Sequence, residues 1–173
     1  MATPAATRVL VISGSMGSGK TAILGEASDL LTANDVLHAA IDLDAISLQL
    51  LPDQLSRNVH VRNIADIHKN CSDAGITRFL VAVAIEDADV LADLKAAFGV
   101  DEIVVCRLTA SVETMAARLR IREPGIRQEE FVERSRQLDV ALDKAALEDF
   151  TLPNDDRNVT EVAEELLRRA GWI

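Results

Sequence analysis

Short apolar runs alternate along the chain with longer segments in which apolar residues recur every three or four positions. A short apolar run that ends at a glycine or a polar turn is typical of a buried strand, and the longer spacing is typical of an amphipathic helix. We therefore expect strands at residues 9–13, 38–43, 79–85, 102–108 and 150–152.

The segments between these runs predict helices, at residues 21–32, 58–75, 88–98, 111–122, 128–147 and from about residue 160. Gly75 and Gly99 stand where glycine commonly ends a helix, and a Glu-Pro-Gly sequence at 123–125 separates two of the predicted helices. Residues 47–57, which include Pro52, have a mixed pattern that predicts a loop or a short helix.

This alternation predicts an α/β fold in three layers, with a parallel sheet of about five strands between helices. Hydrophobic residues make up 49% of the chain but aromatic residues only 3%, which suits Val- and Ile-rich strands under Ala- and Leu-rich helices. With 173 residues, no internal repeat and no visible linker, residues 1–173 are expected to form a single domain.

The formal net charge of −10 argues against nucleic acid and anionic membranes as partners, because both attract clustered Lys and Arg. No apolar run approaches the roughly 18 residues that a membrane span needs, and no signal-like segment opens the chain. Cys71 and Cys106 lack the paired spacing of a zinc or redox site and are expected to be buried thiols. These features together predict a cytoplasmic protein.

One motif points to specific chemistry, because a G-x-x-x-x-G-K-[ST] sequence follows the first predicted strand and opens the first predicted helix. Its residues are Gly14, Ser15, Met16, Gly17, Ser18, Gly19, Lys20 and Thr21. The glycines allow consecutive backbone N–H groups to face phosphate oxygens, and the helix N-terminus adds its positive dipole end. Lys20 is expected to reach the β- and γ-phosphates, and the Thr21 hydroxyl to bind Mg²⁺. This phosphate loop predicts binding of a nucleoside triphosphate, ATP with Mg²⁺.

Acidic residues follow two of the predicted strands, where open α/β sheets present side chains to ligands. Asp42 and Asp44 end the second strand, and either carboxylate is suited to orient an acceptor hydroxyl and accept its proton, with Asp42 favoured as the base. The alternative is that both carboxylates only solvate a loop or cap a helix. Glu86 follows the third strand and resembles an acid that holds Mg²⁺ through water.

Arginine is concentrated late in this acidic chain, at Arg118, Arg120, Arg122, Arg127, Arg134 and Arg136. Two helices with a break between them predict a lid over residues 117–137. Arg118 and Arg122 are four residues apart and share a helical face, from which they are suited to stabilise the charge of a transferred phosphoryl group. The alternative is a solvated helix whose arginines pair with Glu123, Glu129, Glu130 and Glu133.

Taken together, the phosphate loop, the Asp-Leu-Asp sequence at 42–44, the Arg118 and Arg122 pair and the turn at 153–157 resemble small P-loop phosphotransferases. These include adenylylsulfate kinase, gluconate kinase, shikimate kinase and chloramphenicol phosphotransferase. The chain is also similar to small actinobacterial ATP-binding proteins that share the Asp-Leu-Asp sequence and an R-x-R-x-R-E lid. The resemblance covers nearly the whole chain and implies a P-loop NTPase fold, with the last turn near the adenine ring.

The resemblance to adenylylsulfate kinase also implies that Arg57 and Arg62 contact an anionic substrate. That enzyme's D-G-D-N-V-R motif reads Asp42-Leu-Asp-Ala-Ile-Ser47 here, without its central glycine and its arginine. We therefore predict an ATP-dependent kinase in which Lys20, Asp42, Arg118 and Arg122 act on the transferred group and the acceptor is a small molecule with a hydroxyl or phosphate. The alternative is a nucleotide-binding switch or slow ATPase without such an acceptor.

Overall fold

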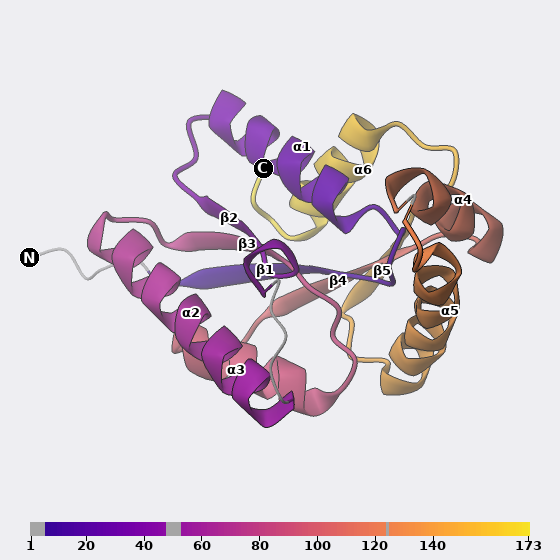
Figure 1. Cartoon of the computed structure of the whole chain (residues 1–173). Helices are drawn as coiled ribbons and strands as arrows, with labels where there is room; N and C mark the ends of the chain where they lie inside the picture. The colour runs from indigo at the N-terminus through magenta and orange to yellow at the C-terminus, as the bar shows by residue number, and fades with distance from the viewer. Residues whose placement is uncertain (1–5, 48–52, 124) are drawn as a thin grey trace, which may run out of the picture.

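The computed structural model of the chain describes residues 6–47, 53–123 and 125–173 (Figure 1). Within them, five parallel strands form one sheet in the order β2-β3-β1-β4-β5. The strands are β1 (Arg8–Ser13), β2 (Ala39–Asp42), β3 (Arg78–Ala82), β4 (Val104–Thr109) and β5 (Phe150–Pro153). Because β1 is central, the turn that follows it lies in the middle of the sheet's carboxyl edge.

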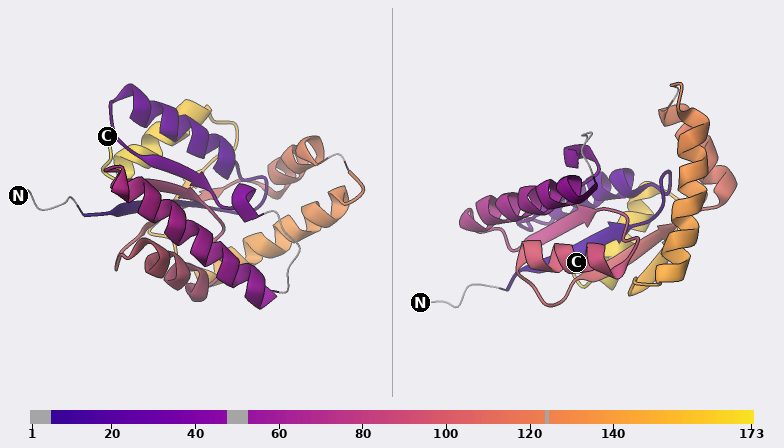
Figure 2. Two further views of the ribbon diagram at one scale, coloured as in Figure 1. Left: turned by 60° about the vertical axis from the view of Figure 1, so that its left-hand side comes forward. Right: turned by 60° about the horizontal axis from the view of Figure 1, so that its bottom comes forward.

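Helices cover both faces of this sheet, as the sequence predicts (Figure 1). They are α1 (Lys20–Ala33), α2 (Asp53–Asp73), α3 (Ala88–Phe98), α4 (Val112–Arg122), α5 (Gln128–Ala145) and α6 (Val159–Arg169), with a short 3-10 helix η1 (Ala45–Ser47). α1 and α6 lie on one face, α2 and α3 on the other, and α4 and α5 stand at one end of the sheet (Figure 2). The predicted α/β three-layer architecture is confirmed.

The strand β1 divides the core between the two faces, because alternate side chains of a strand point to opposite sides. Leu10 and Ile12 are buried with residues of α1 and α6. Val9 and Val11 are buried with Ile64 of α2, Phe98 of α3 and Phe79 of the neighbouring strand β3. Burial on both faces explains why this strand reads as a continuous apolar run in the sequence.

Local signals fix several helix ends. The Asp87 side chain accepts a hydrogen bond from the Val90 amide and begins α3, and Ser111 caps α4 in the same way through the Thr114 amide. Gly99 ends α3 with φ 61°, in the left-handed region that glycine adopts without steric cost. No helix among the described residues is both long and apolar enough to cross a membrane.

Two element boundaries differ from the predicted ones by three residues or more. α2 begins at Asp53, five residues before the predicted start at 58, so the end of the 47–57 segment is helical; residues 48–52 lie outside the described ones. β3 ends at Ala82 instead of residue 85. Beyond Ala82, the Val83 amide still donates to the Ile12 carbonyl of β1 (3.2 Å), but the Ile85 amide donates to the Ser13 hydroxyl (3.0 Å) instead of to a backbone carbonyl.

A buried arginine joins α5 to the sheet. Arg107 on β4 is only 4% exposed, and its guanidinium donates to Asp143 (2.7 Å) and Asp139 (2.9 Å) of α5. A buried cation is stable only when it is paired and hydrogen-bonded, so α5 must stay against β4 for Arg107 to remain satisfied. Nothing in the sequence pattern distinguishes Arg107 from the other arginines.

We predict that Arg107→Ala lowers the free energy of unfolding by about 3 kcal/mol, because it removes the ion pairs and leaves a cavity under α5. Urea denaturation measures this change. The control is Arg168→Ala, which removes an exposed pair with Glu164 and is expected to cost less than about 1 kcal/mol. Equal, small changes in the two variants would show that Arg107 does not anchor α5.

Candidate active site at the phosphate loop

The loop from Gly14 to Thr21 turns sharply between β1 and α1, and its conformation requires glycine at specific positions. Gly17 and Gly19 have φ angles of 84° and 104°, which L side chains rarely adopt. A Cβ on Gly17 would lie 2.7 Å from the Met115 carbonyl oxygen, and one on Gly19 would collide with the Asn154 amide. The spacing of glycines in the motif therefore matches positions where neither backbone geometry nor space admits a side chain.

Lys20 is folded into this loop and is 8% exposed. Its ammonium group donates to the carbonyl oxygens of Gly14 (3.0 Å) and Ser15 (3.2 Å). Burial lowers the pKa of Lys20, although the nearby carboxylates of Asp44 and Asp42 act to raise it and Arg122 acts to lower it. Asp42 and Arg122, which the sequence assigns to catalysis, and Asp44 therefore all act electrostatically on the ammonium group.

Thr21 connects the loop to the end of β2. Its hydroxyl donates to one carboxylate oxygen of Asp42 (2.6 Å), and the other oxygen accepts from the amides of Asp44 (3.1 Å) and Ala45 (3.4 Å). Because the Thr21 proton is directed at Asp42, the lone pairs of the hydroxyl oxygen stay available. This arrangement fits Mg²⁺, which prefers oxygen ligands and completes its shell with phosphate and water.

Glu86, the other predicted metal contact, is exposed where the chain leaves β3. Among the described residues, no three or more His, Cys, Asp or Glu side chains gather in a way that could hold a metal ion. Glu86 as a metal contact stays a prediction.

Side chains from distant parts of the chain hold the loop from outside. The Ser15 hydroxyl donates to the Ser135 carbonyl (2.6 Å), the Ser135 hydroxyl donates to the Met16 carbonyl (2.7 Å), and the Asn154 amide donates to the Ser18 carbonyl (2.7 Å). Ser135 and Asn154 are buried. Sequence reasoning missed both, because an isolated Ser within a helix and an Asn in a turn cluster carry no signal of such a contact.

Arg118 contacts the loop backbone. Its guanidinium donates to the carbonyl oxygens of Gly17 (3.2 Å), Ser18 (3.3 Å) and Asn154 (2.8 Å). Arg118 therefore braces the loop against the β5–α6 turn, and it is half-buried where the sequence predicts a charge-stabilising group. Its contacts in this structure are carbonyl groups of the loop wall.

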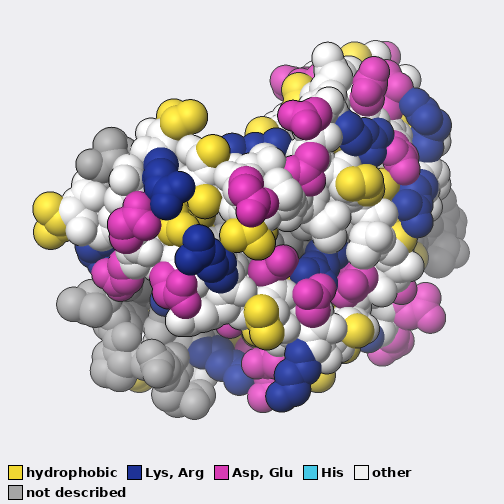
Figure 3. All heavy atoms as spheres, turned by 90° about the vertical axis from the view of Figure 1, so that its right-hand side faces the viewer, with side chains coloured by type: hydrophobic (Ala, Val, Ile, Leu, Met, Phe, Trp, Pro, Cys, Tyr) yellow, Lys and Arg dark blue, Asp and Glu magenta, His cyan; other side chains and the backbone are white. Residues whose placement is uncertain are grey.

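Most other lid arginines pair with glutamates, as the solvated-helix alternative expects. The pairs are Arg120–Glu129, Arg122–Glu123, Arg127–Glu130 and Arg136–Glu133. Figure 3 shows basic and acidic side chains interspersed over the face of the molecule that carries α4 and α5. Arg122 differs from the others because its charge acts on Lys20. Like the other lid pairs, its pair with Glu123 is partly exposed and hence weak.

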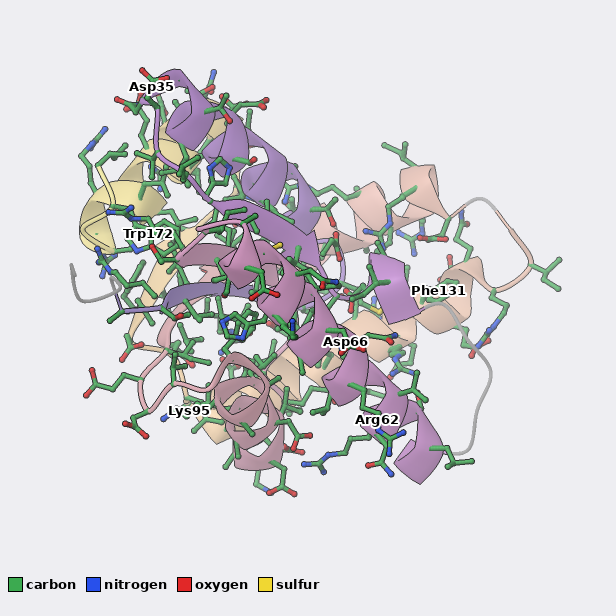
Figure 4. All side chains as sticks on the ribbon, turned by 90° about the vertical axis from the view of Figure 1, so that its left-hand side faces the viewer. Asp35, Arg62, Asp66, Lys95, Phe131 and Trp172 are labelled. Carbon is green, nitrogen blue, oxygen red and sulfur yellow. The ribbon has the colours of Figure 1, made fainter. Side chains whose placement is uncertain are left out.

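A cavity of about 270 Å³ lies between α2, α3 and the ends of β2 and β3. Asp44, Arg57 and Glu86 line it, so the structure brings these three predicted residues together. Arg62 is not among the lining residues and is exposed on the surface of α2 (Figure 4). Arg57 donates to Asp93 (2.5 Å) and lies 3.6 Å from Asp89, so α3 already neutralises its charge.

The structure is similar to solved small P-loop kinases, and these likenesses confirm the predicted fold. A sugar kinase from Janibacter sp. HTCC2649 matches with a TM-score of 0.63 and 23% identity over 94% of this chain and 93% of that one. The APS kinase of Mycobacterium tuberculosis, solved with AMPPNP and APS, matches with a TM-score of 0.66 and 17% identity over 95% and 98%. The tunicamycin resistance protein of Deinococcus radiodurans matches with a TM-score of 0.65 and 16% identity over 96% and 97%. No protein-family model and no curated protein matches the sequence.

We predict that Asn154→Ala loosens the phosphate loop, because the Ser18 carbonyl loses a buried hydrogen bond. The free energy of unfolding should fall by about 1–3 kcal/mol, and the amides of residues 16–19 should exchange hydrogen faster. Asn34→Ala is the matched control: the Asn34 amide also donates to a backbone carbonyl, that of Leu30 (2.8 Å), but in an exposed position. Unchanged exchange in the loop of Asn154→Ala would contradict the bracing role.

The lowered pKa of Lys20 predicts a pH dependence. Between its folded pKa and the ordinary value of 10.5, the unfolded chain keeps a proton that the folded chain has lost, so stability rises with pH in that window. Lys20→Met loses the hydrogen bonds to the Gly14 and Ser15 carbonyls at every pH. Without nucleotide, its stability relative to the wild type should therefore be highest at pH 7 and should fall toward pH 10.5. Urea denaturation at several pH values measures the difference.

Lys69→Met is the control for this experiment. The Asp73 carboxylate raises the pKa of Lys69, so that pair stabilises the folded chain fully below pH 10.5 and loses its effect only above it. The stability difference for Lys69→Met should stay constant from pH 7 to 10. A stability difference between Lys20→Met and the wild type that is equally constant would refute the effect of burial on the pKa of Lys20.

Proposed function

We propose that this chain is a kinase that transfers the γ-phosphoryl group of Mg·ATP to a small-molecule acceptor. The observation that carries the proposal is the 2.6 Å contact of Thr21 with Asp42 beside a cavity lined by Asp44. It links three parts of a transfer site at one sheet edge: a phosphate loop, a carboxylate pair and a space for a second molecule. The solved neighbours support this reading, because one of them holds AMPPNP with APS and another, a shikimate kinase, holds shikimate.

ATP binding would rest mainly on the loop backbone. The positive φ angles of Gly14, Gly17 and Gly19 suit a loop that would direct amide N–H groups at phosphate oxygens, and the N-terminus of α1 adds favourable potential for anions. Lys20 would exchange its contacts with the carbonyls of Gly14 and Ser15 for phosphate oxygens, because a charged acceptor gives the stronger hydrogen bond. Thr21 would hold Mg²⁺, which when bound neutralises charge on the β- and γ-phosphates.

The two carboxylates would have different roles. Asp42 accepts the Thr21 hydroxyl and two loop amides, so its position suits a residue that orients Thr21. Asp44 is exposed, lines the cavity and is the carboxylate that acts most strongly on Lys20. Since a base must face both the acceptor and the phosphates, Asp44 is better placed than Asp42, which the sequence favours, to accept the proton.

In the proposed reaction, the acceptor hydroxyl oxygen forms a bond to the γ-phosphorus while the bond from that phosphorus to the bridging oxygen breaks. ADP leaves with the electron pair of the broken bond, and the hydroxyl proton moves to the Asp44 carboxylate. Arg122 would stabilise the charge on the transferred group after leaving Glu123, whereas Arg118 would keep the loop wall in place.

The test separates the two carboxylates by kinetics. Acceptors are first identified from a panel of hydroxyl and phosphate compounds by ADP release. We expect Asp44→Asn to lower kcat about 100-fold with little change in the KM for Mg·ATP, since it removes the base. We expect Asp42→Asn to raise that KM about 10-fold, since it releases Thr21.

Asp101→Asn, which changes an exposed carboxylate at the opposite edge of the sheet, is the control and should behave as the wild type. Loss of kcat in Asp42→Asn but not in Asp44→Asn would instead identify Asp42 as the base. If Mg·ATP binding depends on Lys20 but no acceptor causes ADP release, the chain is a nucleotide-binding switch and the proposed kinase function is wrong.

A further inference from the structure

The acceptor cavity, defined as the 270 Å³ space lined by Asp44, Arg57 and Glu86, has a mostly apolar wall. The apolar residues are Leu43, Val61, Ile64, Val83, Val90 and Leu94. A wall of this kind contributes affinity through burial of carbon, and the few polar groups determine which ligands are accepted. The charges at the cavity therefore indicate the class of acceptor.

Arg57, the arginine that lines the cavity, already has anionic partners. Arg57 pairs with Asp93 at 2.5 Å and lies 3.6 Å from Asp89, both on α3. Burial lowers the pKa of His60, the other basic residue among the described lining residues, although Asp44 and Asp93 oppose this shift. At neutral pH the cavity thus offers an incoming carboxylate or phosphate no uncommitted cation.

The anionic charge is in excess. Asp44 and Glu86 take no part in the ion pairs of Arg57. Glu86 also lines a second cavity, of about 540 Å³, together with Glu130, Glu133 and Arg134 of α5. Glu130 and Glu133 pair with Arg127 and Arg136, so among the described lining residues the negative charge outside an ion pair rests on Asp44 and Glu86. Beside these two carboxylates a positive group gains and a negative group loses electrostatic energy.

We infer that the acceptor is a hydroxyl compound that carries an ammonium group beside an apolar portion, and that a sugar acid or phosphate ester is excluded. The inference rests on the proposed kinase function, because it assumes that this cavity holds the acceptor. The hydroxyl lies toward Asp44, the ammonium group pairs with Glu86, and the apolar portion contacts the cavity wall. The family resemblance predicts the opposite, an anion held by Arg57 and Arg62.

The first experiment measures binding without turnover, by calorimetric titration in the presence of saturating Mg·ADP. One matched set is phenylalaninol, 3-phenylpropanol and 3-phenyllactate; the other is glucosamine, glucose and gluconate. We expect the ammonium member of at least one set to bind about 10-fold or more tightly than its carboxylate partner. Tighter or equal binding of the carboxylate member, or no binding of either ammonium compound, overturns the inference.

Two substitutions sharpen the result. Glu86→Gln should weaken binding of the ammonium compound about 10-fold and leave the neutral compound within about 2-fold, whereas Glu102→Gln, an exposed site at the opposite sheet edge, should change neither. Arg57→Gln frees the carboxylates of Asp89 and Asp93, so it should maintain or increase ammonium binding. If Arg57→Gln instead abolishes binding of a carboxylate compound, Arg57 is an anion contact and the inference fails.

ADP release distinguishes this inference from the proposed function. If an ammonium compound binds through Glu86 but never stimulates ADP release, the charge assignment holds and the proposed kinase function is wrong. ADP release that depends on a sugar acid or a phosphate ester keeps the kinase and overturns the charge assignment.

Discussion

The structure depends on holding a tight backbone turn around a buried ammonium group. The phosphate loop has glycines with positive φ angles, and Lys20, which lies inside it, is buried. The loop can keep this shape only if its carbonyl groups find donors, because buried carbonyls without partners are costly. Lys20 supplies donors from inside the loop; Arg118, Ser135 and Asn154 supply them from outside.

These outside contacts explain how the C-terminal part of the chain is organised. Arg118 belongs to α4, Ser135 to α5 and Asn154 to the turn after β5, so three successive elements each contribute a donor to one loop. α5 has a second attachment through Arg107 on β4. The ends of the predicted lid nearest the sheet are therefore fixed, and the exposed ion pairs of its outer part are weak enough to exchange.

The sequence predicts those features that rest on local patterns. The loop is recognisable because all of its signals lie within residues 14–21. The central strands β1, β3 and β4 are recognisable because burial on both faces makes each of them a largely apolar run. It does not predict the contact of Asn154 with Ser18, which joins residues 136 positions apart, or the buried pairing of Arg107. Nor does it reveal that Arg57 pairs with α3, because that pair depends on how α2 and α3 pack together.

This difference also explains why the arginines mislead when they are read from sequence alone. An arginine is a phosphate ligand only if its charge is not already paired, and that property belongs to the fold. Here glutamates and aspartates neutralise Arg57, Arg120 and Arg127, and loop carbonyls occupy Arg118. Arg122 also has a carboxylate partner, Glu123, but its charge acts on Lys20, so of these arginines it is the one placed to act at the phosphate loop. Different residues thus set the charge in the two parts of the site. The loop and Arg122 set it around the phosphates, and the carboxylates of Asp44 and Glu86 set it in the acceptor cavity.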